Sequence, residues 1–185
     1  MSDFGDVDAK DLVPGTLRGY RAWTMNRYSG KYSGKLRSVS RAYTWDPGSH
    51  RPAACYYHAQ SVMTLAEEVT IWKPAHPAPA AQCSCGYYAT YDLHNLYAFR
   101  SWHQMNISSI VVGTVKAYGS VVLGTIGFRA EYMEIEALVG SNPLIPVMAG
   151  VYGVPVVPDF ETLLSHYPPS NVDELIGAPS RELLA

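Results

Sequence analysis

An α+β fold with a mostly antiparallel sheet is predicted by three features of the sequence. Polar and apolar residues alternate through residues 16–25 and again through 108–138, as they do in half-buried strands. The apolar spacing typical of a helix is clearest in one segment, which begins at Asp92. Between these regions lies a stretch rich in proline and cysteine that follows neither pattern. We therefore expect a sheet, one main helix and a loop region that needs another organiser.

Length and composition fit a single folded domain. The chain has 185 residues, of which 48% are hydrophobic and 16% charged, as in ordinary globular proteins. We expect this domain to span residues 15–177, after a disordered arm at 1–14 and before a flexible tail at 178–185. The acidic start does not resemble a secretory signal, and no apolar run is long enough to cross a bilayer. These features predict a cytoplasmic protein with no membrane segment.

The first strands should form a hairpin. Residues 16–25 alternate and carry aromatic side chains, which favour strands. The Gly/Ser-rich residues 29–34 are expected to form the loop, and residues 36–45 the returning strand. The sequence Asp-Pro-Gly at 46–48 should end that strand, because it is a strong turn signal.

The middle of the chain gives weaker signals. Residues 53–58 can form a short strand, whereas 62–72 are ambiguous between helix and strand. Residues 73–81 contain three prolines, which predicts that they form no regular structure. Asp92 is a suitable N-cap for the main helix, which should extend over 92–103.

The last third should contain two or three antiparallel strands over 108–138, with bends at its glycines. Residues 143–158 are apolar and interrupted by prolines, and they end in Y-G-V-P-V-V. A short helix is expected over 159–167, because Asp159 can cap its start and two prolines follow its end.

The three cysteines of the chain form the most informative pattern. Cys55, Cys83 and Cys85 lie close together in the sequence, and His76 falls between them. Three thiolates and one imidazole make the four-ligand set that zinc takes in closed structural sites. The motifs of catalytic zinc enzymes are absent. The sequence therefore predicts a structural zinc ion that clips the loop region 53–89.

Several alternatives to this ligand set remain. His58 follows Cys55 with a suitable C-x-x-H spacing, and His50 or water are further candidates for the fourth ligand. The cysteines could also be buried free thiols, which behave as small hydrophobic groups. A redox pair at Cys83 and Cys85 is another alternative, but nothing nearby predicts a lowered thiol pKa.

Charge is distributed unevenly along the chain. Residues 15–52 hold eight Lys/Arg and one acid, whereas 130–185 hold eight acids and one base. The two halves could face each other, or each could face a partner. Bases alternate with aromatics in the first region, as in proteins that bind single-stranded nucleic acid. The candidate contacts are Arg18, Arg21, Trp23, Lys31, Lys35, Arg37 and Arg41. The alternative is a hairpin whose aromatics pack in the core.

Several short motifs resemble those of uncharacterised proteins of actinobacteria and their phages. The motifs are G-Y-R-A-W (19–23), W-D-P-G (45–48), A-A-C (53–55), H-P-A-P (76–79), C-S-C-G-Y-Y-A (83–89), V-V-G-T-V (111–115), G-F-R-A-E-Y (127–132) and Y-G-V-P-V (152–156). The resemblance implies that the three cysteines and His76 act as one unit. It implies no activity.

The sequence thus favours a zinc-stabilised binding protein, actinobacterial or phage-encoded, that contacts a host protein or nucleic acid. The alternative is an enzyme with a pocket around Arg129 and Glu131, which lie two apart on one predicted strand and so face the same way. An ion pair between these two side chains is a further interpretation. An enzyme is the less favoured class, because no catalytic motif is present.

Overall fold

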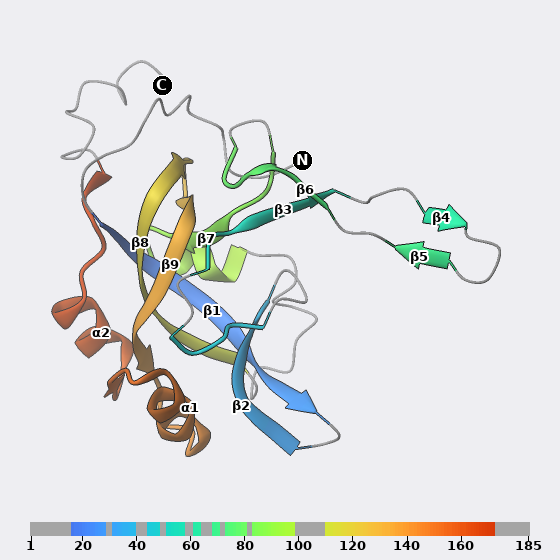
Figure 1. Ribbon diagram of the computed structural model, residues 1–185. Helices are drawn as coiled ribbons and strands as arrows, with labels where there is room; N and C mark the ends of the chain where they lie inside the picture. The colour runs from blue at the N-terminus through green and yellow to red at the C-terminus, as the bar shows by residue number, and fades with distance from the viewer. Residues whose placement is uncertain are drawn as a thin grey trace.

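The computed structural model describes residues 16–28, 31–39, 44–48, 51–57, 61–63, 68–70, 73–80, 83–98 and 110–172. Its strands are β1 (Leu17–Tyr28), β2 (Lys31–Ser38), β3 (Ala54–Tyr57), β4 (Ser61–Met63), β5 (Glu68–Thr70), β6 (Lys73–Pro77), β7 (Tyr87–Thr90), β8 (Ile110–Leu123), β9 (Gly127–Val139) and β10 (Val156–Val157). Its helices are the 3-10 helix η1 (His94–Ala98), α1 (Leu144–Tyr152) and α2 (Phe160–His166). The predicted α+β fold with a mostly antiparallel sheet is confirmed (Figure 1).

Four strands of the main sheet form a closed ring of pairings. β1 pairs with β8, β8 with β9, and β9 with β7, all antiparallel. A single pair, Tyr20 with Thr90, joins β7 back to β1. β2 and β10 then extend the sheet from β1 and β9. The predicted hairpin and the predicted strands of 108–138 are both found in this sheet.

Two irregularities bend the long β8–β9 pair. The register shifts between Thr114 and Val115, and again between Tyr118 and Val121. Gly119 lies in the second irregularity with a φ of 79°, a conformation that glycine adopts readily. Such bulges increase the twist of a strand, which helps a small sheet to close on itself.

The hairpin departs from its prediction at its second strand. β2 begins at Lys31, inside the predicted loop of 29–34, and ends at Ser38 instead of residue 45. Trp45 returns to this strand, because its backbone N–H donates to the carbonyl of Leu36 at 2.8 Å. Thr44 also forms an antiparallel bridge with Arg37, so this segment brings a second tryptophan against the sheet.

Apolar side chains pack on both faces of the sheet. On one face, Trp23 is fully buried and makes an edge-to-face contact with Trp45, with ring centroids 5.5 Å apart. Met148 of α1 belongs to the same cluster. On the other face, Tyr20 packs in a second cluster with Leu163 of α2. The two helices thus help to cover opposite faces of the sheet.

The apolar, proline-interrupted segment 143–158, to which the sequence assigned no element, contains α1. Pro146 is the third residue of this helix, within the first turn, where backbone N–H groups have no partner in the helix. Gly153 ends the helix in the left-handed conformation, with a φ of 67°. The predicted short helix α2 is confirmed, and Asp159 Oδ1 accepts a bond from the N–H of Thr162 at 2.7 Å.

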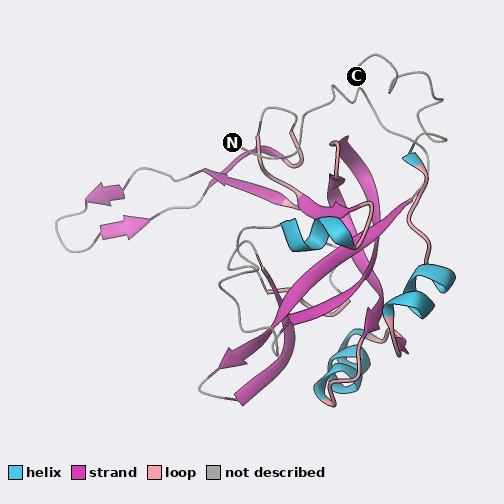
Figure 2. Cartoon of the chain, turned by 180° about the vertical axis from the view of Figure 1, so that it is seen from behind, coloured by secondary structure: helices cyan, strands magenta, loops and turns pink. Residues whose placement is uncertain are grey.

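The proline-rich stretch was predicted wrongly, since it contains strand β6. This strand pairs with β3 in a separate two-stranded sheet, with Pro77 opposite Ala54 and Pro74 opposite Tyr56. A two-stranded sheet has two open edges, and a proline is tolerated where its nitrogen faces such an edge. The ambiguous residues 62–72 contain strand β5 and part of β4. Figures 1 and 2 show the β4–β5 pair far from α1 and α2.

The predicted main helix is only partly within the described residues. Asp92 Oδ1 accepts a bond from the N–H of Asn95 at 2.7 Å, as expected of a cap. The described continuation is the 3-10 helix η1 instead of an α-helix, and residues 99–103 lie outside the described part. The predicted arm and tail also lie outside it. Among the described residues, no helix has the length and apolar character needed to cross a membrane.

Candidate metal centre

The four predicted ligands lie together in the structure. Cys55, His76, Cys83 and Cys85 each offer one ligand atom, and all of these atoms lie within 4.8 Å of one another. The Sγ atoms of Cys55 and Cys83 are 3.6 Å apart, and the Sγ of Cys85 is 4.0 Å from Nδ1 of His76. A tetrahedral zinc site with Zn–S bonds of about 2.3 Å has sulfur atoms about 3.8 Å apart. The spacing therefore suits one four-coordinate metal ion.

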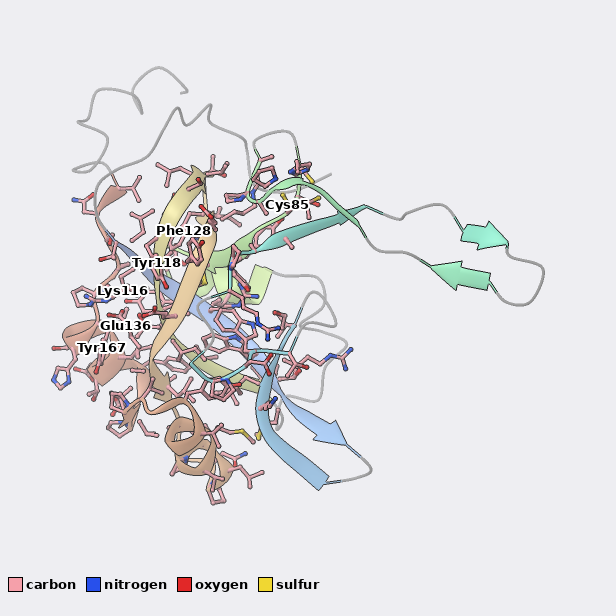
Figure 3. All side chains as sticks on the ribbon, in the orientation of Figure 1. Cys85, Lys116, Tyr118, Phe128, Glu136 and Tyr167 are labelled. Carbon is pink, nitrogen blue, oxygen red and sulfur yellow. The ribbon has the colours of Figure 1, made fainter. Side chains whose placement is uncertain are left out.

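Three separate segments bring these side chains together. Cys55 lies on β3, at the point where its register with β6 shifts, and His76 lies on β6. Cys83 and Cys85 lie in the loop that leads into β7. The backbone N–H of Cys83 donates to the carbonyl of Ala80 at 3.1 Å, which folds this loop into a turn. Figure 3 shows Cys85 where the β3–β6 pair approaches the main sheet.

The cluster is shielded on one side and open on the other. Cys55 and Cys85 are buried and pack against Ala78, whereas His76 and Cys83 are half-buried. His76 and Cys83 are therefore the more accessible members of the cluster.

Burial controls the charge of the thiols. It raises the pKa of Cys55 to about 11, and it also raises the pKa of Cys85. Burial opposes ionisation of Cys83 as well, but hydrogen bonds with Cys55 and His76 lower its pKa to about 7. Without metal, Cys83 is therefore the first thiol to ionise. A divalent cation would displace the remaining protons when it binds.

The His76 ring is oriented by the backbone. Its Nδ1 lies 2.8 Å from the carbonyl oxygen of Pro77, and this bond raises the pKa of the imidazole. The same Nδ1 lies 4.0 Å from the Sγ of Cys85, so this nitrogen faces both the carbonyl and a sulfur atom of the cluster. Either ring nitrogen of a neutral imidazole can serve as a metal ligand. The two other histidines that the sequence offered as ligands, His50 and His58, lie outside the described residues.

Arg129 and Glu131, the predicted centre of an enzyme pocket, bind different segments. Arg129 is buried and donates to the backbone carbonyls of Ala80, Cys83 and Cys85. Glu131 Oε2 accepts a bond from the N–H of Ser120 at 3.2 Å. The role of Arg129 in holding the metal loop was not predicted, because the sequence gives no signal for a contact across 44 to 49 positions.

The prediction of a basic and aromatic nucleic-acid surface was wrong for Trp23 and Arg21, which are 0% and 7% exposed. Alternation places both residues on the face of β1 that packs in the core. Arg21 donates to the carbonyl of Tyr88 and to Ser38 Oγ, and it lies over the ring of Trp45 at 4.9 Å. Neither side chain is available to stack on a base.

The other candidate contacts differ in their surroundings. Arg18 pairs with Glu136, and Lys35 with Asp46. Arg37 is exposed. Lys31 lies in β2, and Arg41 lies outside the described residues. The Arg18 pair joins the basic and acidic parts of the sequence, which supports the interpretation that they face each other.

The cluster of three cysteines and one histidine is thus the chemical centre of the described structure. Its four side chains could hold one metal ion, and Arg129 binds the loop that carries Cys83 and Cys85. No protein-family model matches the chain, and no curated protein or solved structure shows significant similarity to it.

Proposed function

We propose that Cys55, His76, Cys83 and Cys85 bind one zinc ion with a structural role. The observation that carries this proposal is the convergence of three sulfur atoms and one imidazole within 4.8 Å. Thiolate ligands favour zinc over magnesium or calcium, which prefer oxygen. Four protein ligands complete a tetrahedral shell and leave no position for a reacting water. The ion would therefore stabilise the fold and perform no catalysis.

The position of the site explains why the protein would need this ion. The β3–β6 pair is a two-stranded sheet, and such a pair is marginally stable by itself. A backbone bond of 2.6 Å from the N–H of Ala53 to the carbonyl of Glu131 links its beginning to β9. The metal would add a second link, from β3 and β6 to the loop before β7.

Elemental analysis of protein purified without added metal tests this proposal. We expect about one zinc per chain in the wild type and a large loss in Cys83→Ser. Ser84→Ala is the matched control, because Ser84 is exposed and lies between two ligands without belonging to the cluster. A wild-type protein that holds no zinc, and takes up none when it is added, would refute the proposal.

We further propose that the protein acts by binding another protein. Large apolar side chains are exposed on two helices: Val147 (58%) and Val151 (42%) on α1, and Phe160 (40%) and Leu164 (44%) on α2. Each pair is spaced i, i+4, so its members share one helix face. Exposed apolar patches commonly mark protein interaction sites. Nucleic acid is the less favoured partner, because Trp23 and Arg21 are buried.

Affinity capture with matched variants tests this second part. A protein captured by the wild type should be lost with Val147→Glu and retained with Ser165→Glu, which adds the same charge at an exposed polar position of α2. A capture that both variants retain would argue against α1. Salt-dependent binding of a short single-stranded DNA, weakened in Arg37→Ala, would instead support nucleic acid.

The three cysteines also support a proposed location. All are free thiols in the structure. Thiolate ligands persist in a reducing compartment such as the cytoplasm. If the chain is phage-encoded, which is one of the two origins that its resemblance implies, this would be the cytoplasm of the host.

A further inference from the structure

Arg129 is buried at the base of the candidate metal centre. It lies on β9, is 4% exposed, and its Nη1 lies 3.2 Å from the carbonyl oxygen of Ala80 and 3.1 Å from that of Cys85. The same nitrogen also donates to the carbonyl of Cys83. One side chain of the main sheet therefore binds the backbone of two proposed ligands.

The loop lies directly against the arginine. Gly86 follows Cys85 with a φ of 113°, a conformation that other residues rarely adopt. A Cβ atom at this glycine would lie 3.2 Å from the Cβ of Arg129 and 3.0 Å from that of Pro79. Glycine thus allows the backbone of the loop to approach the arginine closely.

Charge balance gives the contact a second role. A zinc ion with three thiolates and one neutral imidazole carries a net charge of −1. A buried charge is costly unless an opposite charge or hydrogen bonds compensate it. The guanidinium of Arg129 carries +1 and binds the peptide carbonyls of Cys83 and Cys85, the residues that carry two of the proposed thiolate ligands. The pair of centre and arginine would be neutral overall.

We infer that Arg129 is the positioning residue of the metal centre, an inference that rests on the proposed zinc site. Its hydrogen bonds fix the loop so that Cys83 and Cys85 meet Cys55 and His76 before the metal binds. Its charge favours the loaded, anionic centre over the empty one. Residues that orient metal ligands typically change metal affinity by about 10- to 100-fold when they are replaced.

Competition with a chromogenic chelator measures the zinc affinity of each variant. We expect Arg129→Gln to weaken zinc binding about 10- to 100-fold, since it removes both the charge and most of the donors. Arg129→Lys keeps the charge but loses the planar set of donors. Its zinc affinity should therefore lie between those of the wild type and Arg129→Gln. It also serves as the test protein if Arg129→Gln fails to fold.

Arg21→Gln is the matched control. Arg21 is 7% exposed and also donates to a backbone carbonyl, but that carbonyl belongs to Tyr88 on β7, which is not a proposed ligand. This variant should lower the melting temperature and leave zinc affinity within about twofold of the wild type. The visible absorption of the cobalt-substituted protein should change with Arg129→Gln and stay unchanged with Arg21→Gln, because it reports the geometry around the metal.

The outcomes distinguish the role of Arg129 from the existence of the zinc site. Zinc affinity equal to that of the wild type in both Arg129 variants would overturn the positioning role while leaving the zinc site intact. An equal loss of affinity in Arg21→Gln would also overturn it, because general destabilisation would then be sufficient. A wild-type protein that binds neither zinc nor cobalt would refute the site itself.

Discussion

The Sγ of Cys55 lies 3.6 Å from the Sγ of Cys83, although the two residues are 28 positions apart in the chain. Two thiolates at this distance repel each other unless a proton or a cation lies between them. The raised pKa of Cys55, about 11, reflects the same conflict in addition to burial. A bound divalent cation would remove this repulsion, because the cation replaces the protons and attracts both sulfur atoms.

The first prediction is that stability depends on free zinc. If only the folded state binds the ion, the free energy of unfolding should rise by about 1.4 kcal/mol for each tenfold increase in free zinc above the dissociation constant. Urea unfolding in zinc buffers measures this slope. Cys83→Ser should abolish it and Ser84→Ala should retain it. A wild-type protein whose stability is independent of zinc would contradict the prediction.

The second prediction concerns the core of the sheet. Trp23 is fully buried and contacts the ring of Trp45, so Trp23→Ala should destabilise the fold by about 3–5 kcal/mol. Arg37→Ala, an exposed change on the neighbouring strand, should alter stability by less than about 0.5 kcal/mol. Urea unfolding compares the two. A small effect of Trp23→Ala would mean that this side chain is not in the core, which would restore it as a candidate for nucleic-acid contact.

The sequence was sufficient where the signal is local or chemical. Alternation along 16–25 and 108–138 predicted strands, because a period of two is visible within a few residues. The convergence of Cys55 and Cys83 could be predicted without knowing the fold between them, since a metal needs those ligand types together. Asp159 predicted the start of α2 for a similar reason, because a cap binds the backbone of the next few residues.

The sequence was insufficient where tertiary context decides. Alternation shows that Trp23 and Arg21 share a face but not whether that face meets water or the core. Prolines in 73–81 suggested irregular structure, yet Pro77 falls in a two-stranded sheet, where it is tolerated. The sequence assigned no element to 143–158, where Pro146 falls in the first turn of α1. The bonds of Arg129 to the loop of Cys83 and Cys85 depend on the closure of the sheet, so no local sequence pattern predicts them.

The third prediction concerns the ion pair between β1 and β9. Arg18 donates to both carboxylate oxygens of Glu136, at 2.6 and 3.0 Å, and both side chains are partly exposed (Figure 3 labels Glu136). A double-mutant cycle with Arg18→Met and Glu136→Gln should give a coupling of about 0.5–1 kcal/mol. The coupling should decrease in high salt, which screens exposed charges. A coupling near zero at low salt would show that the pair adds no stability.

The fourth prediction concerns high pH. Burial raises the pKa of Tyr20, Tyr118 and Tyr152 from about 10 to about 12. Between these values an unfolded chain loses the phenolic protons while the folded chain keeps them, so the unfolded state is favoured as pH rises. The free energy of unfolding of the zinc-loaded protein should therefore fall between about pH 10 and 12, above the pH range in which the cysteine thiols of the unfolded chain ionise.

Urea titrations at closely spaced pH values check this window. Tyr152→Phe should reduce the fall in stability, because it removes one of the three phenols. It should also lower stability at neutral pH, since the Tyr152 hydroxyl donates to the carbonyl of Trp45 at 2.7 Å and accepts from the N–H of Leu36 at 2.8 Å. Stability that stays level through pH 12 would contradict the assignment of these raised pKa values.

The fifth prediction compares two glycines. A Cβ atom at Gly127, where β9 begins, would lie 2.1 Å from the carbonyl oxygen of Ala89 on β7, so Gly127→Ala must push these strands apart. We expect a loss of at least about 2 kcal/mol, because the ring of strand pairings would be disturbed. Gly150 lies in α1 with no atom within 4 Å of its added Cβ, and Gly150→Ala should stabilise the helix by about 0.5–1 kcal/mol. Thermal unfolding of both variants should show shifts of opposite sign, and a harmless Gly127→Ala would argue against the close approach of β7 to β9.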